Sequence, residues 1–555
     1  MTEENDVAVG VDRRRFLQGI GALGAAAVVS GGIARRADAS PSPTLLRQPD
    51  AVDAPPADLL HLQFGADASE SVVASWSTLV RVRRPRLRLG TRSGGMGDTV
   101  AAHERAYTDA LTGETVYTYH APITDLHADH AYVYEVFAAG SPAVSGRFRT
   151  APRGRKPFRF SSFGDQAIPA AVGAGKLVGP HTPNAGYIVD AVEATDPLFH
   201  LLNGDLCYAN VSDDPVATWR SFFGNNMRSA RNRPWMPAAG NHENEAGNGT
   251  EGMEAYRNWF WLPDNGEQDD WQGNWYTFRV GNVGVVSLNN DDVCLQAGSF
   301  VPYRLTNLGA NYRQDYLNGY THAEQKAWLE RTLGKLRADR DIDWIVVCMH
   351  QVAMSSAHFN GADLGIREEW LPLFERYGVD LVVAGHEHHY ERSHAVLGFD
   401  SQLAGPGGVK LLTPEPRTSA LDVVDTTKGT VHMIIGGGGH SSPTPPTAFD
   451  APHDGVVIYG VDTSGVVNGI GPRPALTTIE PADWSAVRDV INPYGFCTFD
   501  VDPGKKGEKT SITVTYHAAT AGSTDYSRVV DSFRLERPRS DGHVLARVGA
   551  LPPDT

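Results

Sequence analysis

Apolar and polar residues alternate with a period of two over the first part of the chain that has a structural pattern. The alternation falls in six short segments separated by turn-forming residues: 60–64, 72–77, 86–89, 116–121, 132–137 and 146–150. Such a period places every second side chain on the same face of a strand, so each segment predicts a half-buried β-strand. Several short strands joined by turns favour an all-β sandwich, which we assign to residues 57–152.

After Pro157 the pattern changes to apolar runs that alternate with helical periodicity. Residues 344–348 and 379–384 are short apolar runs of the kind found in strands buried on both faces. Thr321 and Glu324 form a capping-box pattern ahead of the first run, and residues 367–377 predict a helix that ends at Gly378 before the second. The pattern predicts a layered α/β domain, a β-sandwich flanked by helices, over residues 156–540, with a C-terminal part at 430–540 and a tail at 541–555.

Several apolar runs of this second domain end in residues that can bind a metal ion. Five stretches between residues 160 and 392 supply such residues: Asp165, Asp205, Tyr208, Asn241, His350, His386 and His388. Their side chains offer lone pairs to hard or borderline metals, and loops at strand ends converge on one crest of an α/β sheet. The sequence therefore predicts a metal site. Cys207 lies in the same stretch as Asp205, where a small buried residue is favoured over a soft metal ligand.

The net charge limits the classes of partner, and the cysteine content limits the kinds of disulfide and metal site. The net charge is -16 at pH 7, which argues against nucleic acid or an anionic membrane as a general partner, because a phosphate backbone would be repelled by the average surface. An anionic substrate must therefore find local positive charge. The four cysteines are too few and too scattered for a disulfide scaffold or a thiolate zinc site; one disulfide is possible and none is required.

The N-terminal residues 1–39 have the features of an export signal. Arg13 and Arg14 precede an apolar segment rich in Gly and Ala, and a small-residue cleavage site follows at residues 37–39. This form resembles the twin-arginine pathway, which carries folded proteins. An uncleaved anchor is the less favoured alternative, because the segment is short of the roughly 20 residues needed to span a bilayer. We expect a periplasmic, cell-wall or extracellular protein with no stable membrane anchor, beginning with a Pro-, Ser- and Ala-rich linker at 40–56.

Taken together, the order and spacing of the five stretches resemble the purple acid phosphatases, a branch of the metallophosphoesterase superfamily. The resemblance covers residues 58–540, and the first domain is similar to a fibronectin type III domain, with Trp76 in mid-strand and a tyrosine corner at Tyr132. One departure is Ala167, where the family usually has glycine two residues after the first aspartate. That departure concerns the shape of the pocket rather than the metal ligands.

The resemblance implies a dinuclear centre of ferric iron and one divalent metal (Zn, Mn or Fe). The ferric ligands would be Asp165, Asp205, Tyr208 and His388. The divalent ligands would be Asp205, Asn241, His350 and His386, with Asp205 bridging the two ions. Carboxylate and phenolate oxygens suit ferric iron, whereas two imidazoles and an amide suit the divalent ion. The implied activity is hydrolysis of phosphate monoesters at mildly acidic pH, through attack by a metal-bound hydroxide.

Two histidines are candidates for the catalytic acid that protonates the leaving alkoxide. His242 follows the implied ligand Asn241, and His358 lies eight residues after His350; His242 is the preferred candidate. Four further histidines lie near the motifs without matching a ligand position, and we expect supporting or surface roles for them: His181, His389, His394 and His440. His389 could hydrogen-bond a neighbouring ligand.

Two other functions compete with a monoesterase that acts on a small-molecule phosphate ester. A phosphodiesterase or nucleotidase could use the same metals, since the long segments at 167–186 and 291–320 would decide how many ester groups the pocket admits. A non-catalytic cell-wall-binding protein is the alternative from another class, and seven intact ligand positions argue against it. The run Gly436–Gly439 favours a turn over a phosphate cradle, and the arginines between Arg81 and Arg88 favour a solvated strand face over an anion patch.

Overall fold

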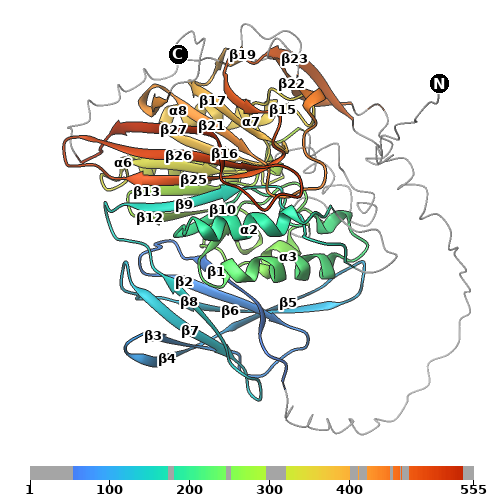
Figure 1. The fold of residues 1–555 in the computed structure, drawn as a ribbon, viewed down its shortest axis with the longest axis vertical. Coiled ribbons are helices and arrows are strands. Elements are labelled where there is room, and N and C mark those ends of the chain that lie inside the picture. The colour runs from blue at the N-terminus through green and yellow to red at the C-terminus, as the bar shows by residue number, and fades with distance from the viewer. Residues whose placement is uncertain are drawn as a thin grey trace, which may run out of the picture. The chain divides into compact units, whose positions relative to one another are not determined.

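Two four-stranded sheets form the N-terminal β-rich domain of the protein (Figure 1). The structure is a computed structural model that describes residues 54–172, 180–245, 252–295, 320–400, 410–411, 422–449, 454–462, 464 and 474–541. The first sheet has the order β1 (Asp58–Phe64), β2 (Val72–Thr78), β6 (Thr115–Ile123), β5 (His103–Thr108), and the second has the order β4 (Gly95–Ala101), β3 (Arg86–Thr91), β7 (Ala131–Phe137), β8 (Val144–Arg149). The predicted all-β sandwich is confirmed.

The structure adds two strands that the alternation did not reveal. β4 and β5 are mostly exposed, and β4 contains two glycines, so neither presents a clear apolar face to the core. The tyrosine corner is present, because the backbone N–H of His127 donates to the Tyr132 hydroxyl at 2.9 Å. Trp76 is buried on β2, 5.9 Å from the ring of Tyr119. The arginines of this region are mainly a solvated face, where Arg81 pairs with Glu104 and Arg88 with Glu135.

Two seven-stranded sheets form the second domain. One has the order β11 (Trp235–Pro237), β10 (Phe199–Leu202), β9 (Phe158–Phe163), β25 (Tyr494–Asp502), β26 (Lys509–Ala519), β27 (Arg528–Pro538), β20 (Val423–Asp425). The other has the order β12 (Tyr276–Val280), β13 (Val283–Ser287), β14 (Trp344–Cys348), β16 (Leu381–Ala384), β21 (Thr430–Ile435), β17 (Tyr390–Val396), β24 (Ser485–Asp489). The predicted order of a β-rich domain followed by a layered α/β domain is confirmed.

Helices and short elements complete the second domain. The helices are α2 (Asn184–Ala194), α3 (Pro215–Ala230), α4 (Glu254–Trp259), α6 (Glu324–Ala338), α7 (Leu364–Glu369) and α8 (Leu371–Tyr377). The 3-10 turns are η1 (Ala209–Val211), η2 (Asp269–Trp271), η3 (Asn290–Asp292), η7 (Thr426–Lys428) and η8 (Pro446–Ala448). The remaining strands are β15 (Ala362–Asp363), β22 (Asp454–Val461) and β23 (Ala475–Pro481), which form one small sheet, and the pair β18 (Phe399–Asp400) and β19 (Lys410–Leu411).

Two helix predictions need correction. The helix at α6 is present, but its N-cap is Ala323 without a side-chain cap, because the Thr321 hydroxyl donates to Asp292 at 2.7 Å instead of closing a capping box. The predicted helix at 367–377 is two helices that meet at Trp370; the chain bends there, directly before Pro372. Its expected end is right, since Gly378 caps α8 with a φ of 60°.

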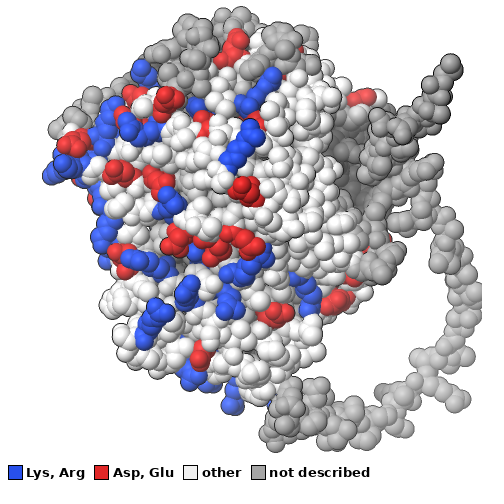
Figure 2. All heavy atoms as spheres, viewed as in Figure 1, with Lys and Arg blue, Asp and Glu red and all other residues white. Residues whose placement is uncertain are grey.

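The apolar core is continuous from the sandwich into the second domain. One cluster of buried side chains runs from Leu62 and Phe64 on β1 through Phe199 on β10 to Phe499 on β25, and Phe160 stacks on Phe499 at 4.5 Å. A second cluster lies between α6, α7 and α8 and the sheet that contains β14. Charged residues are interspersed with both signs on the face seen in Figure 2. Among the described residues, no helix combines the length and the apolar content that crossing a bilayer requires. The twin-arginine segment lies outside the described residues.

Candidate metal centre

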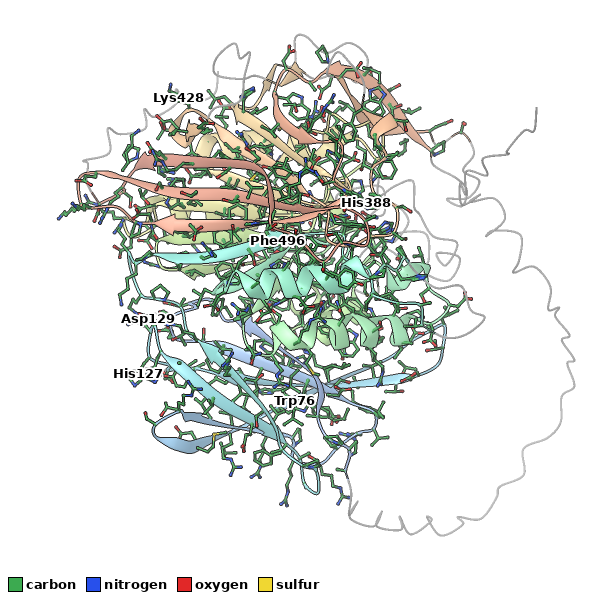
Figure 3. All side chains as sticks on the ribbon, in the orientation of Figure 1. Trp76, His127, Asp129, His388, Lys428 and Phe496 are labelled. Atoms are coloured by element: carbon green, nitrogen blue, oxygen red, sulfur yellow. The ribbon has the colours of Figure 1, made fainter. Side chains whose placement is uncertain are left out.

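The residues predicted to bind metal follow strands that run side by side in the two large sheets. β9, β10 and β11 are parallel neighbours and lead to Asp165, Asp205 and Asn241. In the other sheet β14 and β16 are parallel neighbours and lead to His350 and His386. Parallel strands end at the same edge of a sheet, so these loops meet on one crest. Figure 3 shows His388 on this crest, at the strand ends of the second domain.

Four of the seven predicted ligands have a left-handed backbone. The φ angles are 59° for Asp165, 50° for Asp205, 59° for Tyr208 and 70° for His386. A non-glycine residue in this region costs of order 1–3 kcal/mol and persists where the surrounding structure holds it. Gly240 explains how the loops approach so closely, because a Cβ at this position would collide with Asp205. The backbone is therefore bent so that these side chains converge.

Asp205, Asn241, His350 and His386 form the first of two adjoining groups. His350 Nε2 lies 2.9 Å from Asp205 Oδ2, and His386 Nδ1 lies 3.3 Å from His350 Nε2 and 3.1 Å from Asn241 Oδ1. The ligand atoms of Asp205, His350 and His386 all lie within 4.8 Å of one another. Because His350 Nδ1 donates to the Asn203 carbonyl at 2.7 Å, Nε2 is the atom that faces the group.

This first group fits a cation. Burial alone would lower the pKa of His350, but the carboxylates of Asp205 and Asp165 more than offset it and raise that pKa to about 10. A proton at this position thus takes the place that a metal ion would occupy. Two imidazole nitrogens, an amide oxygen and a carboxylate are the donors that a borderline divalent ion prefers.

Asp165, Tyr208 and His388 form the second group. The Tyr208 hydroxyl donates to Asp165 Oδ1 at 3.1 Å, and His388 Nε2 lies 3.3 Å from the same oxygen. His388 Nδ1 donates to the Ser442 carbonyl at 2.6 Å, which again leaves Nε2 facing the group. Burial raises the pKa of Tyr208 well above 10, and Asp165 and Asp205 add to the effect. A phenolate here would require a strongly charged cation, so a hard trivalent ion fits this donor set.

Two supports of the crest were not identified from the sequence. Glu243 is buried, and its carboxylate accepts the backbone N–H groups of Asp205, Leu206 and Gly240, each at 2.8 Å. Burial and the neighbouring Asp205 raise the pKa of Glu243. Its position directly after His242 was the available signal. One glutamate thus holds the backbones of two loops that supply predicted ligands.

The turn η3 provides the second support. The Asn290 side chain accepts the backbone N–H of His350 at 2.7 Å. The Asp291 carboxylate accepts from Asn244 at 2.9 Å and from Gln351 at 2.6 Å, which ties the loop of Asn241 to the loop of His350. Burial raises the pKa of Asp291 to about 6. The signal in the sequence was the polar run 289–292, which directly follows the apolar strand β13.

The two candidate acids have different surroundings. His242 is at the crest: its backbone N–H donates to Asp205 Oδ1 at 2.9 Å, its Nδ1 contacts Asn210 Oδ1 at 2.8 Å, and its ring lies 4.4 Å from Tyr208. His358 instead directs Nε2 to the Asp454 carboxylate at 2.8 Å. The next residue, Phe359, is 42% exposed with its ring 5.8 Å from His388. The segment of His358 thus borders the crest, while the imidazole itself is bound to Asp454.

The other histidines divide into two kinds. His389 pairs with Glu391 at 3.4 Å and not with a predicted ligand, so that expectation is wrong; the ring turns away from the crest toward β17. His440, in contrast, lies directly on the crest, with its ring 4.4 Å from Tyr208 and 4.2 Å from His388. The run Gly436–Gly439 before it is a tight turn, in which Gly438 donates to the Gly164 carbonyl at 2.9 Å. Parts of the long segments, at 173–179 and 296–319, lie outside the described residues.

The four cysteines form no disulfide in the structure. Cys207, Cys294, Cys348 and Cys497 are all buried and free. Cys207 belongs to the apolar cluster beneath the crest, and burial raises the pKa of its thiol well above the ordinary value. The interpretation of Cys207 as a small core residue is confirmed.

Comparisons with known proteins agree with this architecture. A model of the calcineurin-like phosphoesterase family matches residues 123–390, and a model of the purple acid phosphatase N-terminal domain matches residues 57–150. An uncharacterized protein of Mycobacterium tuberculosis is 47% identical over 540 residues, which cover 96% of this chain and 97% of that relative.

More distant relatives are named purple acid phosphatases. Purple acid phosphatase 21 of Arabidopsis thaliana is 28% identical over 318 residues, which cover 55% of this chain and 62% of that protein. The solved structure of a purple acid phosphatase from seeds of yellow lupin (Lupinus luteus) superposes with a TM-score of 0.62 at 18% identity, and the match covers 90% of this chain and 77% of that one.

Proposed function

Because the chain belongs to the purple acid phosphatases, within the calcineurin-like phosphoesterases, we propose that it is an exported acid phosphatase that hydrolyses phosphate monoesters at a dinuclear metal centre. One observation supports this proposal: two adjoining groups of buried side chains, centred on Asp165 and Asp205, bring together oxygen and nitrogen atoms that could bind two cations. That the protein is a hydrolase of the phosphoesterase type follows from the family itself.

The two donor groups support a mixed pair of ions. Asp165, Tyr208 and His388 would hold ferric iron, and Asn241, His350 and His386 would hold zinc, manganese or ferrous iron, with Asp205 shared. When bound, the ions would supply positive charge and Lewis acidity toward phosphoryl oxygens and would acidify water at the site. Two Asp and one tyrosinate leave an excess of positive charge that a phosphate dianion complements. A chain of net charge -16 can therefore attract an anionic ester at this one place.

The side chains of the crest would orient the ester and move its proton. Asn210 holds Nδ1 of His242, so Nε2 is the atom directed to the substrate, and it lies 4.0 Å from Asp205 Oδ2. From there the imidazolium form of His242, which keeps Nδ1–H on Asn210, would deliver its Nε2 proton to the departing alkoxide oxygen and become the neutral ring. His358 is the second candidate acid, but its bond to Asp454 makes this role less favourable.

Colour and metal content test the proposal. We expect holoprotein expressed with ample iron to be pink to violet, because a tyrosinate bound to ferric iron transfers charge in the visible range. Tyr208→Phe should abolish the band, while Asp165, Asp205 and His388 retain much of the iron. Tyr117→Phe in the sandwich is the matched control and should leave the colour unchanged. An active, colourless wild type that contains only divalent metals would remove ferric iron from the proposal.

Paired substrates test the reaction class. Turnover of 4-nitrophenyl phosphate should exceed turnover of bis(4-nitrophenyl) phosphate with the same holoprotein. A preference for the diester would favour the phosphodiesterase alternative, and no hydrolysis of either ester by protein with both metals bound would favour a binding protein.

Export is a separate part of the proposal and rests on Arg13, Arg14 and the apolar segment that follows. Changing both arginines to lysine should retain the protein in the cytoplasm, as fractionation would detect. Undiminished export of the double variant would contradict the twin-arginine route and would leave the hydrolase proposal untouched.

A further inference from the structure

His440 is held on the crest by its own backbone and by that of its neighbours. Its N–H donates to the Asp165 carbonyl at 3.0 Å, and its carbonyl accepts from the Tyr494 hydroxyl at 3.2 Å. The preceding carbonyl, of Gly439, accepts from the Thr182 hydroxyl at 2.6 Å. Three elements therefore fix this residue before any ligand arrives.

The ring of His440 lies among side chains proposed to act at the metal centre. It packs 4.4 Å from the ring of Tyr208, the same distance at which His242 packs against Tyr208, and 4.2 Å from the ring of His388. Two histidines that are not proposed ligands thus contact the one proposed tyrosine ligand. Only one of them, His242, was a catalytic candidate from the sequence.

The hydrogen bonds of His440 define which nitrogen carries its proton. The backbone N–H of Ser442 donates to His440 Nδ1 at 3.0 Å. A nitrogen that accepts a hydrogen bond has no proton of its own, so the imidazole proton is on Nε2. No described residue accepts a hydrogen bond from Nε2, and the side chain is partly exposed. The crest therefore presents a fixed N–H donor that the fold itself leaves without an acceptor.

We propose that His440 is a substrate-contacting residue whose Nε2–H donates a hydrogen bond to a non-bridging oxygen of the bound phosphate group, on the side of Tyr208 and His388. This inference rests on the proposed function, since it names a further contact to the same substrate. A donor fixed in advance stabilises negative charge on a phosphoryl oxygen without the cost of reorienting a side chain or water. His440 and His242 both pack against the ring of Tyr208, and both would contact the phosphate.

Three substitutions in full-length holoprotein separate donation from packing. His440→Phe keeps a ring against Tyr208 and removes the donor. His440→Gln places an amide N–H near the position of Nε2, whereas the shorter His440→Asn places it near Nδ1. His517→Phe is the control for the exchange of ring type, because His517 stacks on Phe496 at 5.0 Å on β26. Metal content, visible absorption, calorimetric affinity for inorganic phosphate, and kcat and KM on 4-nitrophenyl phosphate are measured for each.

We expect affinity for inorganic phosphate to fall in the variants that lack an N–H at the Nε2 position. His440→Phe and His440→Asn should bind inorganic phosphate about 10- to 100-fold more weakly, the range for losing a hydrogen bond to a charged group, with metal content and colour retained. His440→Gln should recover most of the affinity, and His517→Phe should match the wild type. If His440→Phe loses metal, the phosphate affinities of His440→Gln and His440→Asn test the inference instead. Both side chains are polar, and only that of Gln reaches the Nε2 position.

Equal phosphate affinity in wild type and His440→Phe, or equal losses in Gln and Asn variants that retain both metals, would overturn the inference. Either result with an active wild type would leave the proposed function standing. A wild type that carries both metals yet neither binds phosphate nor hydrolyses the ester would instead contradict the proposed function.

Discussion

The sandwich and the metal crest use polar residues in opposite ways. In the sandwich, buried polar groups bond to one another and to the backbone: Ser75 contacts His120 at 2.8 Å, and Tyr119 accepts the N–H of Val82 at 2.9 Å. On the crest, atoms that can each donate a lone pair to a metal face one another: His386 Nδ1 lies 3.3 Å from His350 Nε2. Figure 3 shows the two regions by Trp76 and His388.

The backbone shows the same contrast. Left-handed non-glycine residues of the sandwich, such as Arg84, Asp125 and Asp129, lie in turns between strands, where that conformation reverses the chain. On the crest four of them are proposed ligands, and Ala167, two residues after Asp165, is another left-handed residue. The backbone of the sandwich is therefore strained only where the chain reverses, whereas the backbone of the crest is strained at residues that bring side chains of different loops together. Changes on the crest should then affect turnover more than folding, and changes in the sandwich the reverse.

The largest expected effect is at His242. His242→Ala should lower kcat on 4-nitrophenyl phosphate by about 10²- to 10⁴-fold while both metals stay bound, the range for loss of a positioned acid. His127→Ala, an exposed histidine of the sandwich, should change neither quantity. Unchanged turnover in His242→Ala would remove this residue from the mechanism.

Glu243 should give a smaller loss through metal affinity. Glu243→Gln keeps the shape of the side chain but replaces one of the oxygens that accept N–H groups from Asp205, Leu206 and Gly240, so we expect affinity for the divalent ion and turnover to fall about 10- to 100-fold. Glu245→Gln is the matched control, because the Glu245 carboxylate accepts from the Trp219 indole at 2.5 Å. Metal titration that gives equal affinities for the two variants would show that Glu243 does not position the ligands.

His61 joins the two domains and should shape the pH dependence of stability. Burial lowers its pKa from 6.5 to about 4, although the Leu59 and Trp259 carbonyls face its two ring nitrogens and favour the charged form; the neutral ring can donate to only one of them. The buried neutral form therefore contributes fully above pH 6.5, and its contribution falls by up to about 1.4 kcal/mol per unit as the pH drops from 6.5 toward 4. His61→Gln should show a correspondingly shallower decline in the free energy of urea unfolding. Parallel curves for the two proteins would contradict this assignment.

The smallest effect is expected at the tyrosine corner. Tyr132→Phe removes the acceptor of the His127 N–H and should lower the free energy of unfolding by about 1 kcal/mol, with kcat and KM unchanged. Tyr117→Phe, whose hydroxyl has no hydrogen-bond partner within the described ranges, should lie within about 0.5 kcal/mol of the wild type. A loss of turnover in Tyr132→Phe at constant metal content would contradict the expectation that changes in the sandwich affect folding rather than turnover.

The sequence was informative wherever a local pattern determines the structure. Alternation predicted six strands of the sandwich, such as β7, whose buried and less buried positions alternate, and apolar runs predicted β14 and β16. It failed at β4 and β5, which have little apolar face to bury, and at Thr321, whose hydroxyl donates to Asp292 of a distant turn and accepts the Gln325 N–H only at 3.4 Å, so no capping box with Glu324 forms.

The same division applies to the candidate site. The sequence by itself determined the residue types, their order and their position after apolar strands, and these, with the family resemblance that they carry, predicted the seven proposed ligands and His242. Only the tertiary structure decided that Glu243 holds the loops of Asp205 and Asn241, that Asp291 joins the loop of Asn241 to that of His350, that His358 is bound to Asp454 and that His440 lies on Tyr208. These contacts join residues far apart in the chain, so they depend on how the two sheets bring their strand ends together, which no local spacing encodes.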